Sequence, residues 1–193
     1  LGLGARCDAT KEPIVISFQK KTRPFVTQIS AGSSHSLILT QEDGVFSFGS
    51  NRHGRLGLGD RYSRLRPSVI KDLNDVDIIQ VSAGDAHSLV LTSEGDVYSF
   101  GCGTHGQLGF TDDCSDRDRP SKLPKLSERV ARVCASRTRS RLLLHDGRVI
   151  LFGADITSSP KSNTISVSCS KGVGSTRSSS DRLILPEFSW GSS

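Results

Sequence analysis

Residues 82–109 read SAGDAHSLVLTSEGDVYSFGCGTHGQLG, and residues 30–57 read SAGSSHSLILTQEDGVFSFGSNRHGRLG. The two stretches align without a gap at a constant offset of 52 residues, and 17 of their 28 positions are identical. Self-similarity at a fixed period of about 50 residues is typical of propeller blades and of comparable array units. The sequence therefore predicts a repeat architecture.

Each copy predicts short β-strands. In the first copy, residues 36–40 and 45–48 are β-type runs, and the Asp43-Gly44 pair between them is a strong hairpin signal. A glycine-rich connection follows, and then two further runs at residues 66–70 and 77–81. Four short strands in each unit match a propeller blade. The predicted fold class is all-β: a partial β-propeller of about three to four blades, built from ~52-residue repeats of short antiparallel strands.

The repeat divides the whole chain into units. We expect the end of a preceding repeat and a lead-in strand in residues 1–28, repeats in 29–80 and 81–132, a degenerate repeat with a Ser-rich link in 133–164, and a shortened fourth repeat in 165–193. The composition of residues 158–180 favours a linker. By contrast, residues 165–169 alternate like a strand, and residues 188–191 repeat 98–101. Both interpretations of the last unit stay open.

The composition limits the classes of partner. The 193 residues carry a net charge of +5, with a pI of about 9.1. This balance allows a weak attraction to chromatin or nucleic acid, but the charges are scattered, which favours an ordinary basic surface. No apolar run approaches the ~18 residues of a membrane span, so we expect no membrane partner. The chain contains no Met and begins with Leu1, which indicates a fragment or a processed product.

The five cysteines are odd in number, without a C-x-x-C pair or a histidine at zinc-finger spacing. We therefore expect no metal site and no cofactor. The chain also lacks an N-x-[ST] sequon. These features favour a reducing compartment, either the cytoplasm or the nucleus.

The residues that recur in both copies are those that a packed β-unit needs. Gly32 and Gly84 suit a close backbone approach, and Phe48 and Phe100 are expected to pack between sheets. His35 and His87 recur beside Ser36 and Ser88, and His53 and His105 recur in the H-G-x-L-G turn. A histidine that recurs in each blade favours a structural role over a catalytic one, with its ring bonded across the hairpin or to the next blade.

Signals for catalysis are weak. Glycine-rich residues 54–59 and 170–176 do not match the phosphate-loop pattern, and neither a metalloprotease helix motif nor a nucleophile elbow is present. We expect no catalytic residue and no covalent catalysis. Residues 137–141 alternate cations, which predicts either an anion clamp or a solvated edge.

The pattern A-G-x-x-H-[S]-L-x-L-T…G-x-V-[FY]-S-[FW]-G-x-x-x-x-G-x-L-G resembles the repeat of the regulator of chromosome condensation family. Residues 30–59 and 82–109 match it closely, 133–153 partly and 167–191 loosely. The resemblance implies a seven-bladed β-propeller. Its members include guanine-nucleotide exchange factors for the small GTPase Ran that also bind chromatin. Others are interaction modules in ubiquitin ligases, kinases and photoreceptors.

By this resemblance, the loop before each repeated histidine is the place for partner contact, because loops on a rigid scaffold carry function. The residues expected there are Ser34, Asp85, Arg137 and Arg139, of which only Asp85 is acidic. The resemblance favours a module that binds a protein partner through its rim loops. The alternative is guanine-nucleotide exchange on a Ran-type GTPase.

Overall fold

The computed structural model describes residues 14–18, 24–111, 113–153 and 164–167. Within them lie twelve strands in three four-stranded sheets and two short 3-10 turns, and no α-helix. No helix in this part of the chain is long and apolar enough to cross a membrane. The prediction of an all-β propeller array is confirmed, and each sheet is one blade.

The first blade is an antiparallel meander in the order β1-β2-β3-β4. Its strands are β1 (Val26–Ala31), β2 (His35–Thr40), β3 (Gly44–Gly49) and β4 (Arg64–Val69). The predicted turn between β2 and β3 is confirmed: Gly44 has a φ of 75°, and the Thr40 hydroxyl donates to its carbonyl oxygen at 2.8 Å. The 3-10 turns η1 (Arg52–Gly54) and η2 (Lys71–Leu73) lie in the connections on either side of β4.

The second blade repeats this order. It contains β5 (Ile78–Ala83), β6 (His87–Thr92), β7 (Val97–Gly101) and β8 (Arg117–Lys122). Its registers follow those of the first blade. His87 lies opposite Gly101 as His35 lies opposite Gly49, and each first strand has a register shift near its start. The repeat in sequence is therefore a repeat in strand pairing.

The third blade keeps three antiparallel strands although its sequence has diverged. These are β9 (Val130–Ser136), β10 (Arg139–Leu144) and β11 (Val149–Gly153). Its outer strand, β12 (Thr164–Val167), pairs with β11 in parallel, whereas β4 and β8 pair in antiparallel fashion. Residues 165–167 of the expected fourth unit thus lie in the third sheet, and residues 168–193 lie outside the described part.

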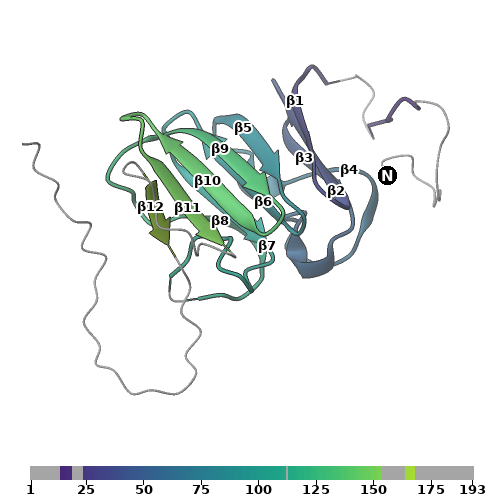
Figure 1. Ribbon diagram of the computed structural model, residues 1–193. Coiled ribbons are helices and arrows are strands. Elements are labelled where there is room, and N and C mark those ends of the chain that lie inside the picture. The colour runs from purple at the N-terminus through teal and green to yellow at the C-terminus, as the bar shows by residue number, and fades with distance from the viewer. Residues whose placement is uncertain (1–13, 19–23, 112, 154–163, 168–193) are drawn as a thin grey trace, which may run out of the picture.

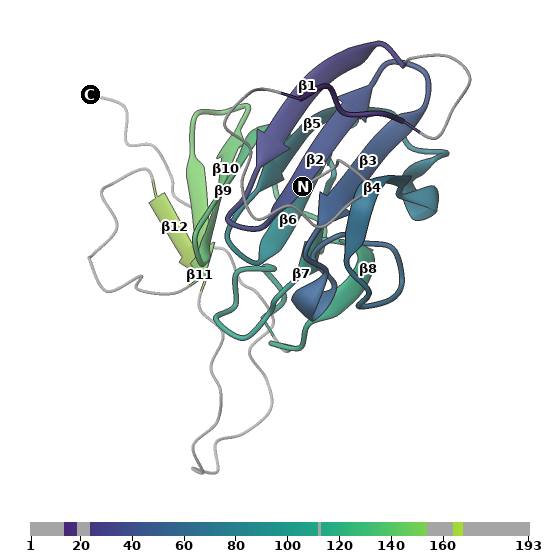
Figure 2. The same ribbon diagram turned by 90° about the vertical axis from the view of Figure 1, so that its right-hand side faces the viewer.

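The blades pack face to face, as Figures 1 and 2 show. We call the interface between the β1–β4 and β5–β8 sheets the first seam, and that between the β5–β8 and β9–β12 sheets the second seam. Phe100 is buried in the first seam, and Phe152 takes the same repeat position in the second. Gly57 and Gly109, both at positive φ, lie against these two rings, where a Cβ would stand 2.8 and 3.0 Å from ring carbons.

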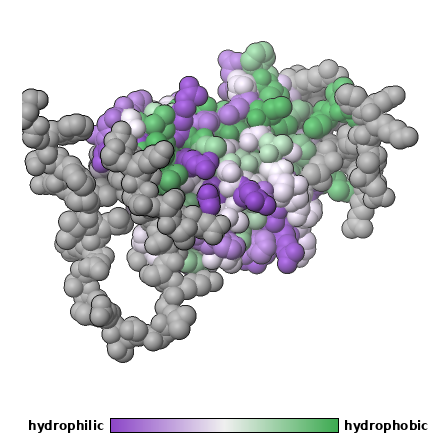
Figure 3. Space-filling model, viewed as in Figure 1, coloured by the Kyte–Doolittle hydropathy of each residue, from purple (hydrophilic) through white to green (hydrophobic). Residues whose placement is uncertain are grey.

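The opposite face of the first blade has a smaller core. There, Ile38, Phe46 and Phe48 pack with Ile16 and Phe18 of the lead-in segment. Around β1, Figure 3 shows apolar surface, to which Phe25, Val26 and Ile29 contribute. Ile29 is 73% exposed, whereas Val81 at the same position of the second blade is 1% exposed. The first blade covers this position of the second blade, whereas the same position of the first blade is largely exposed.

Candidate partner-binding rim

The repeated histidines bond from each blade to the next. His35 Nε2 lies 2.9 Å from Ser88 Oγ, and His87 Nε2 lies 2.8 Å from Ser140 Oγ. Each serine hydroxyl in turn donates to a carbonyl of the earlier blade, that of Arg55 or Gln107. Because a hydroxyl has one hydrogen to give, each histidine must donate from Nε2. Nδ1 then carries the lone pair and has no hydrogen-bond partner.

The electrostatics of these rings argue against acid–base chemistry. Burial lowers the pKa of His35 to about 3, with further lowering from Arg55 and His87 nearby. Burial likewise lowers the pKa of His87 to about 4. Both rings are therefore neutral at pH 7 and are shielded from solvent, at 1% and 0% exposure. Neither ring can reach a substrate.

The glycines beside these rings are sterically required. A Cβ on Gly32 would clash with the carbonyl oxygen of Gly84 and lie 2.8 Å from His35 Nδ1. A Cβ on Gly84 would clash with the His87 ring. Distances below about 3 Å leave no room for a side chain. The close approach predicted for both Ala-Gly pairs is present.

The loops before the histidines form a row along one end of the blades. The Ser33 hydroxyl donates to the Asp85 carbonyl at 2.7 Å, and the Asp85 N–H donates to the Arg137 carbonyl at 3.0 Å. We call this row, residues 32–34, 84–86 and 136–138, the rim. Three of the four residues expected to contact a partner, Ser34, Asp85 and Arg137, lie along it. Arg139 follows at the start of β10, at the position that the repeated histidine holds in the other blades.

Arg55 links the first two rim loops and was missed by the sequence interpretation. Its Nη1 donates to Ser34 Oγ at 2.6 Å and to the Asp85 carbonyl at 2.9 Å, while Nε donates to the Arg52 carbonyl. Burial lowers the pKa of this guanidinium, which stays charged at neutral pH. Gln107 stands at the same position of the second blade. The difference between the two copies was therefore the sequence signal that could have pointed to Arg55.

Two charged side chains at the centre of the rim form few contacts within the fold. Among the described residues, the Asp85 carboxylate forms no hydrogen bond or ion pair, and the same holds for the exposed Arg137 guanidinium. Arg137 has a φ of 46°, in the left-handed region, a conformation that is uncommon for a residue other than glycine. The rim therefore presents one anionic and one cationic side chain on loops that are joined by hydrogen bonds.

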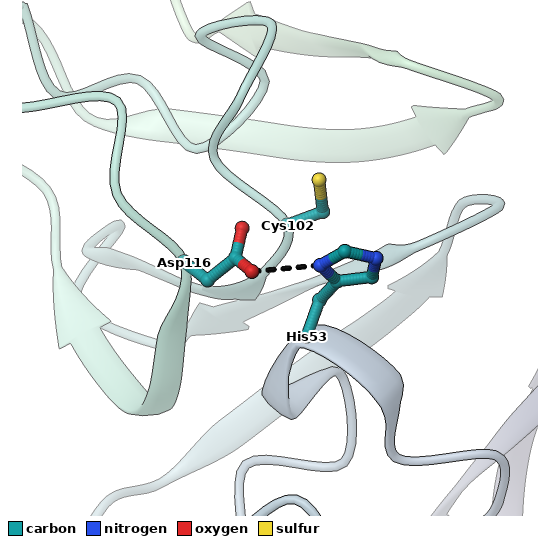
Figure 4. Close-up of side chains that lie close together, drawn as sticks. All are labelled: His53, Cys102 and Asp116. Atoms are coloured by element: carbon teal, nitrogen blue, oxygen red, sulfur yellow. Dashed lines mark hydrogen bonds and ion pairs between the residues drawn. The ribbon is translucent and has the colours of Figure 1, made fainter.

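A second cluster was also missed, and it lies in the first seam at the same end of the blades. His53 from η1 meets Cys102 and Asp116, which flank the β7–β8 connection, as Figure 4 shows. His53 Nδ1 lies 2.7 Å from Asp116 Oδ2. Burial acts to raise the pKa of Asp116, but the hydrogen bonds from His53 and from the Gly103 N–H outweigh it, and the net pKa is lowered.

The cysteines differ in state. Cys102 and Cys134 are free thiols, the first buried and the second exposed, while Cys114 is disulfide-bonded.

Comparison with known proteins places this geometry in a family. The model of the regulator of chromosome condensation (RCC1) repeat matches residues 42–91 and 94–140, and a second model of the same repeat matches 26–55 and 78–107. The chain belongs to the RCC1 repeat family. The blades of this RCC1-repeat chain are therefore propeller blades by sequence as well as by structure.

Its relatives are longer proteins. The chain is 34% identical over 155 residues to the probable E3 ubiquitin-protein ligase HERC4 of Rattus norvegicus, covering 79% of this chain and 14% of that protein. Human WBSCR16 shares the fold with a TM-score of 0.64 and 27% identity, over 72% of this chain and 34% of that one. Prp20p of Saccharomyces cerevisiae, described with its binding to Gsp1p and histones, has a TM-score of 0.58 and 25% identity, over 66% and 33%.

Proposed function

We propose that this chain is a protein-interaction module that binds a protein partner through its rim. One observation carries the proposal: the charged side chains of Asp85 and Arg137 form no hydrogen bond or ion pair among the described residues, and Asp85 has only a Coulombic attraction to Arg55. Both stand on loops that are fixed by hydrogen bonds to backbone carbonyls, at 2.7 Å from the Ser33 hydroxyl and 3.0 Å from the Asp85 N–H. A preorganised surface binds without the cost of ordering its loops, so these charges suit recognition.

The identity of the neighbouring groups favours binding over catalysis. The buried histidines are neutral and solvent-shielded. The rim itself has no nucleophile paired with a base among the described residues. A carboxylate and a guanidinium a loop apart would instead recognise a surface that carries both signs of charge. Such complementarity sets specificity and the association rate.

Capture experiments with charge-reversal variants test the proposal. The variants are Asp85→Lys and Arg137→Glu, and the matched control is Glu42→Lys, an exposed charge reversal in the β2–β3 turn at the other end of the first blade. We expect one or more proteins to be captured by the wild type and by the control, and at least about tenfold less by both rim variants. Equal capture by all four proteins would overturn the proposal.

A second candidate function is guanine-nucleotide exchange on a Ran-type small GTPase. The observation in its favour is the likeness to Prp20p, at 25% identity. In this function, Asp85 is the acid that acts at the phosphate and magnesium site of the GTPase. Release of labelled GDP from such a GTPase, with and without the complete protein, decides between the two candidates. Acceleration that Asp85→Lys abolishes supports exchange, and release at the intrinsic rate removes it.

Chromatin is a third partner class, and the net charge of +5 is what favours it. Binding to DNA through scattered lysines and arginines releases counterions, so affinity must fall steeply as salt rises. Titration of duplex DNA at two salt concentrations measures this slope. A flat dependence, or no binding at low salt, would exclude the nucleic-acid part of the proposal.

A further inference from the structure

The cluster of His53, Cys102 and Asp116 joins two blades through three different kinds of ligand atom. The imidazole comes from the first blade, and the thiol and carboxylate come from the second. One ligand atom from each residue lies within 4.8 Å of the other two. Figure 4 shows the Cys102 side chain beside the His53–Asp116 contact, with its sulfur directed away from that contact in this view.

The separation of these atoms suits a small tetrahedral cation. Bonds of about 2.0–2.3 Å to a tetrahedral Zn²⁺ place ligand atoms about 3.3–3.8 Å apart. The His53–Asp116 contact of 2.7 Å must open slightly, and the longest separation of 4.8 Å must close by about 1 Å, which side-chain rotation can supply. Thiolate, imidazole and carboxylate together favour Zn²⁺ or Co²⁺ over the oxygen-seeking Ca²⁺ and Mg²⁺.

Comparison of the two blades shows that the thiol and carboxylate are additions to the repeat. Cys102 stands where the first blade has Ser50, directly after the third strand of its sheet. Asp116 stands where the first blade has Ser63, directly before the fourth strand. Ser63 Oγ accepts a hydrogen bond from the Asn51 N–H, and Asp116 Oδ1 accepts one from the Gly103 N–H at 3.1 Å. The carboxylate therefore fulfils the local role with one oxygen and presents the other to His53.

The backbone of His53 has an uncommon conformation. Its φ of 67° lies in the left-handed region, and His105 at the same repeat position is not among the described residues with positive φ. Such a conformation costs on the order of 1 kcal/mol or more and persists where surrounding contacts hold it. The ring of His53 contacts Asp116 at 2.7 Å.

Further neighbours surround these groups, and one is the buried Arg55 guanidinium, which has Coulombic interactions with Cys102 and Asp116. Thr104 Oγ1 lies 3.1 Å from Cys102 Sγ and can donate to a thiolate. Such outer hydrogen bonds tune metal ligands. Arg61 lies 3.9 Å from Asp116 Oδ2, but its side chain is 61% exposed and can turn into solvent when a cation enters.

We propose that His53, Cys102 and Asp116 bind one zinc-class cation that bridges the first two blades. Three protein ligands leave a fourth position, which water or a donor from a partner takes. Since the ligands are 49 and 63 residues from His53, no short spacing in the sequence could reveal the site. The proposal does not depend on the function of the rim.

Titration with Co²⁺ tests the site, because thiolate–Co²⁺ charge transfer in the near ultraviolet reports cysteine ligation directly. We expect one Co²⁺ per chain with this band, displaced by Zn²⁺. Cys102→Ser should remove the band and weaken binding by about 100-fold or more, and His53→Gln by at least about tenfold. Cys134→Ser, at the other free thiol of the described residues, is the control and should keep the band.

The double variant Cys102→Ser/Asp116→Ser guards against a folding failure. It copies Ser50 and Ser63 of the first blade and keeps a hydroxyl for the Gly103 N–H. Zn²⁺ should raise the thermal midpoint of the wild type and leave that of the double variant unchanged. Absence of the charge-transfer band in the wild type, its survival in Cys102→Ser, or equal Zn²⁺ stabilisation of both proteins would overturn the proposal.

Discussion

The first and second seams share the same pattern of hydrogen bonds between blades but differ at one end. In both, a glutamine and a serine of the earlier blade accept hydrogen bonds from backbone N–H groups of the next. Gln28 and Ser30 accept from Val81 and Ala83 across the first seam, and Gln80 and Ser82 accept from Val133 and Ala135 across the second. The histidine–serine–carbonyl relay is also present in both.

The first seam then adds residues that the repeat does not contain. Arg55 spans the seam, where the second blade has Gln107. Cys102 and Asp116 converge on His53, in place of the serines at the same positions of the first blade. The comparison teaches that repeated residues hold the blades together, and that the side chains added to the first seam lie at one end of it.

The largest effect is expected from the aromatic ring at the centre of each seam. Phe100→Ala and Phe152→Ala should each lower the free energy of unfolding by about 3–5 kcal/mol, because each ring is fully packed. Chemical denaturation measures both. Similar losses would confirm that the seams are equivalent, while a loss below about 1 kcal/mol for one ring would show that its seam is loosely packed.

The repeated histidines should make stability depend on pH. His35 and His87 are neutral when folded, with pKa values of about 3 and 4, and they gain a proton near pH 6.5 when unfolded. The unfolded state therefore binds more protons below pH 6.5, and stability falls as pH decreases from 6.5 toward 4. The expected loss is roughly 3 kcal/mol for each histidine.

Denaturation at pH 7.0, 6.0 and 5.0 measures this slope above the range in which carboxylates titrate. The variants His35→Gln and His87→Gln keep a donor for the serine but cannot titrate, so each should flatten the curve. An unchanged slope in both variants would contradict the buried, neutral assignment.

The covered and uncovered copies of one repeat position should differ by a smaller amount. Val81→Ala removes buried methyl groups from the first seam and should cost about 1–3 kcal/mol, while Ile29→Ala should cost less than about 0.5 kcal/mol. Their exposures of 1% and 73% are the reason. A large loss for Ile29→Ala would mean that another part of the protein covers β1.

A still smaller change should follow from making the first seam more like the second. Arg55→Gln copies Gln107 and removes the hydrogen bonds to Ser34 and Asp85, which should cost about 1 kcal/mol because burial of the charge offsets part of their strength. Differential scanning calorimetry detects this as a shift of a few degrees. A rise in stability would show that the buried charge is kept for a purpose other than folding.

Much of the fold could be predicted because its signals are local or periodic. The paired leucines and the Ala-Gly close approach recur at an offset of 52 residues, and the Asp43-Gly44 turn is a local signal, for which the second copy has Gly95-Asp96. The site could be predicted only in part. Loop positions such as Asp85 follow from the repeat, whereas Arg55 and the His53 cluster depend on which side chains face each other across a seam. The parallel pairing of β12 depends on chain that follows Gly153, where the repeat pattern is weak.

The central claim is that repeated residues stabilise the seams and that rim charges are free for a partner. The free energy of unfolding of Asp85→Lys, measured beside that of Gly84→Ala, tests it most directly. Asp85→Lys should change stability by less than about 1 kcal/mol, because the half-buried Asp85 carboxylate forms no hydrogen bond among the described residues and has only a Coulombic attraction to Arg55. Gly84→Ala, which drives a methyl group into the His87 ring, should cost at least about 1–3 kcal/mol. Equal losses for these neighbours would mean that Asp85 is part of the fold and would contradict the account.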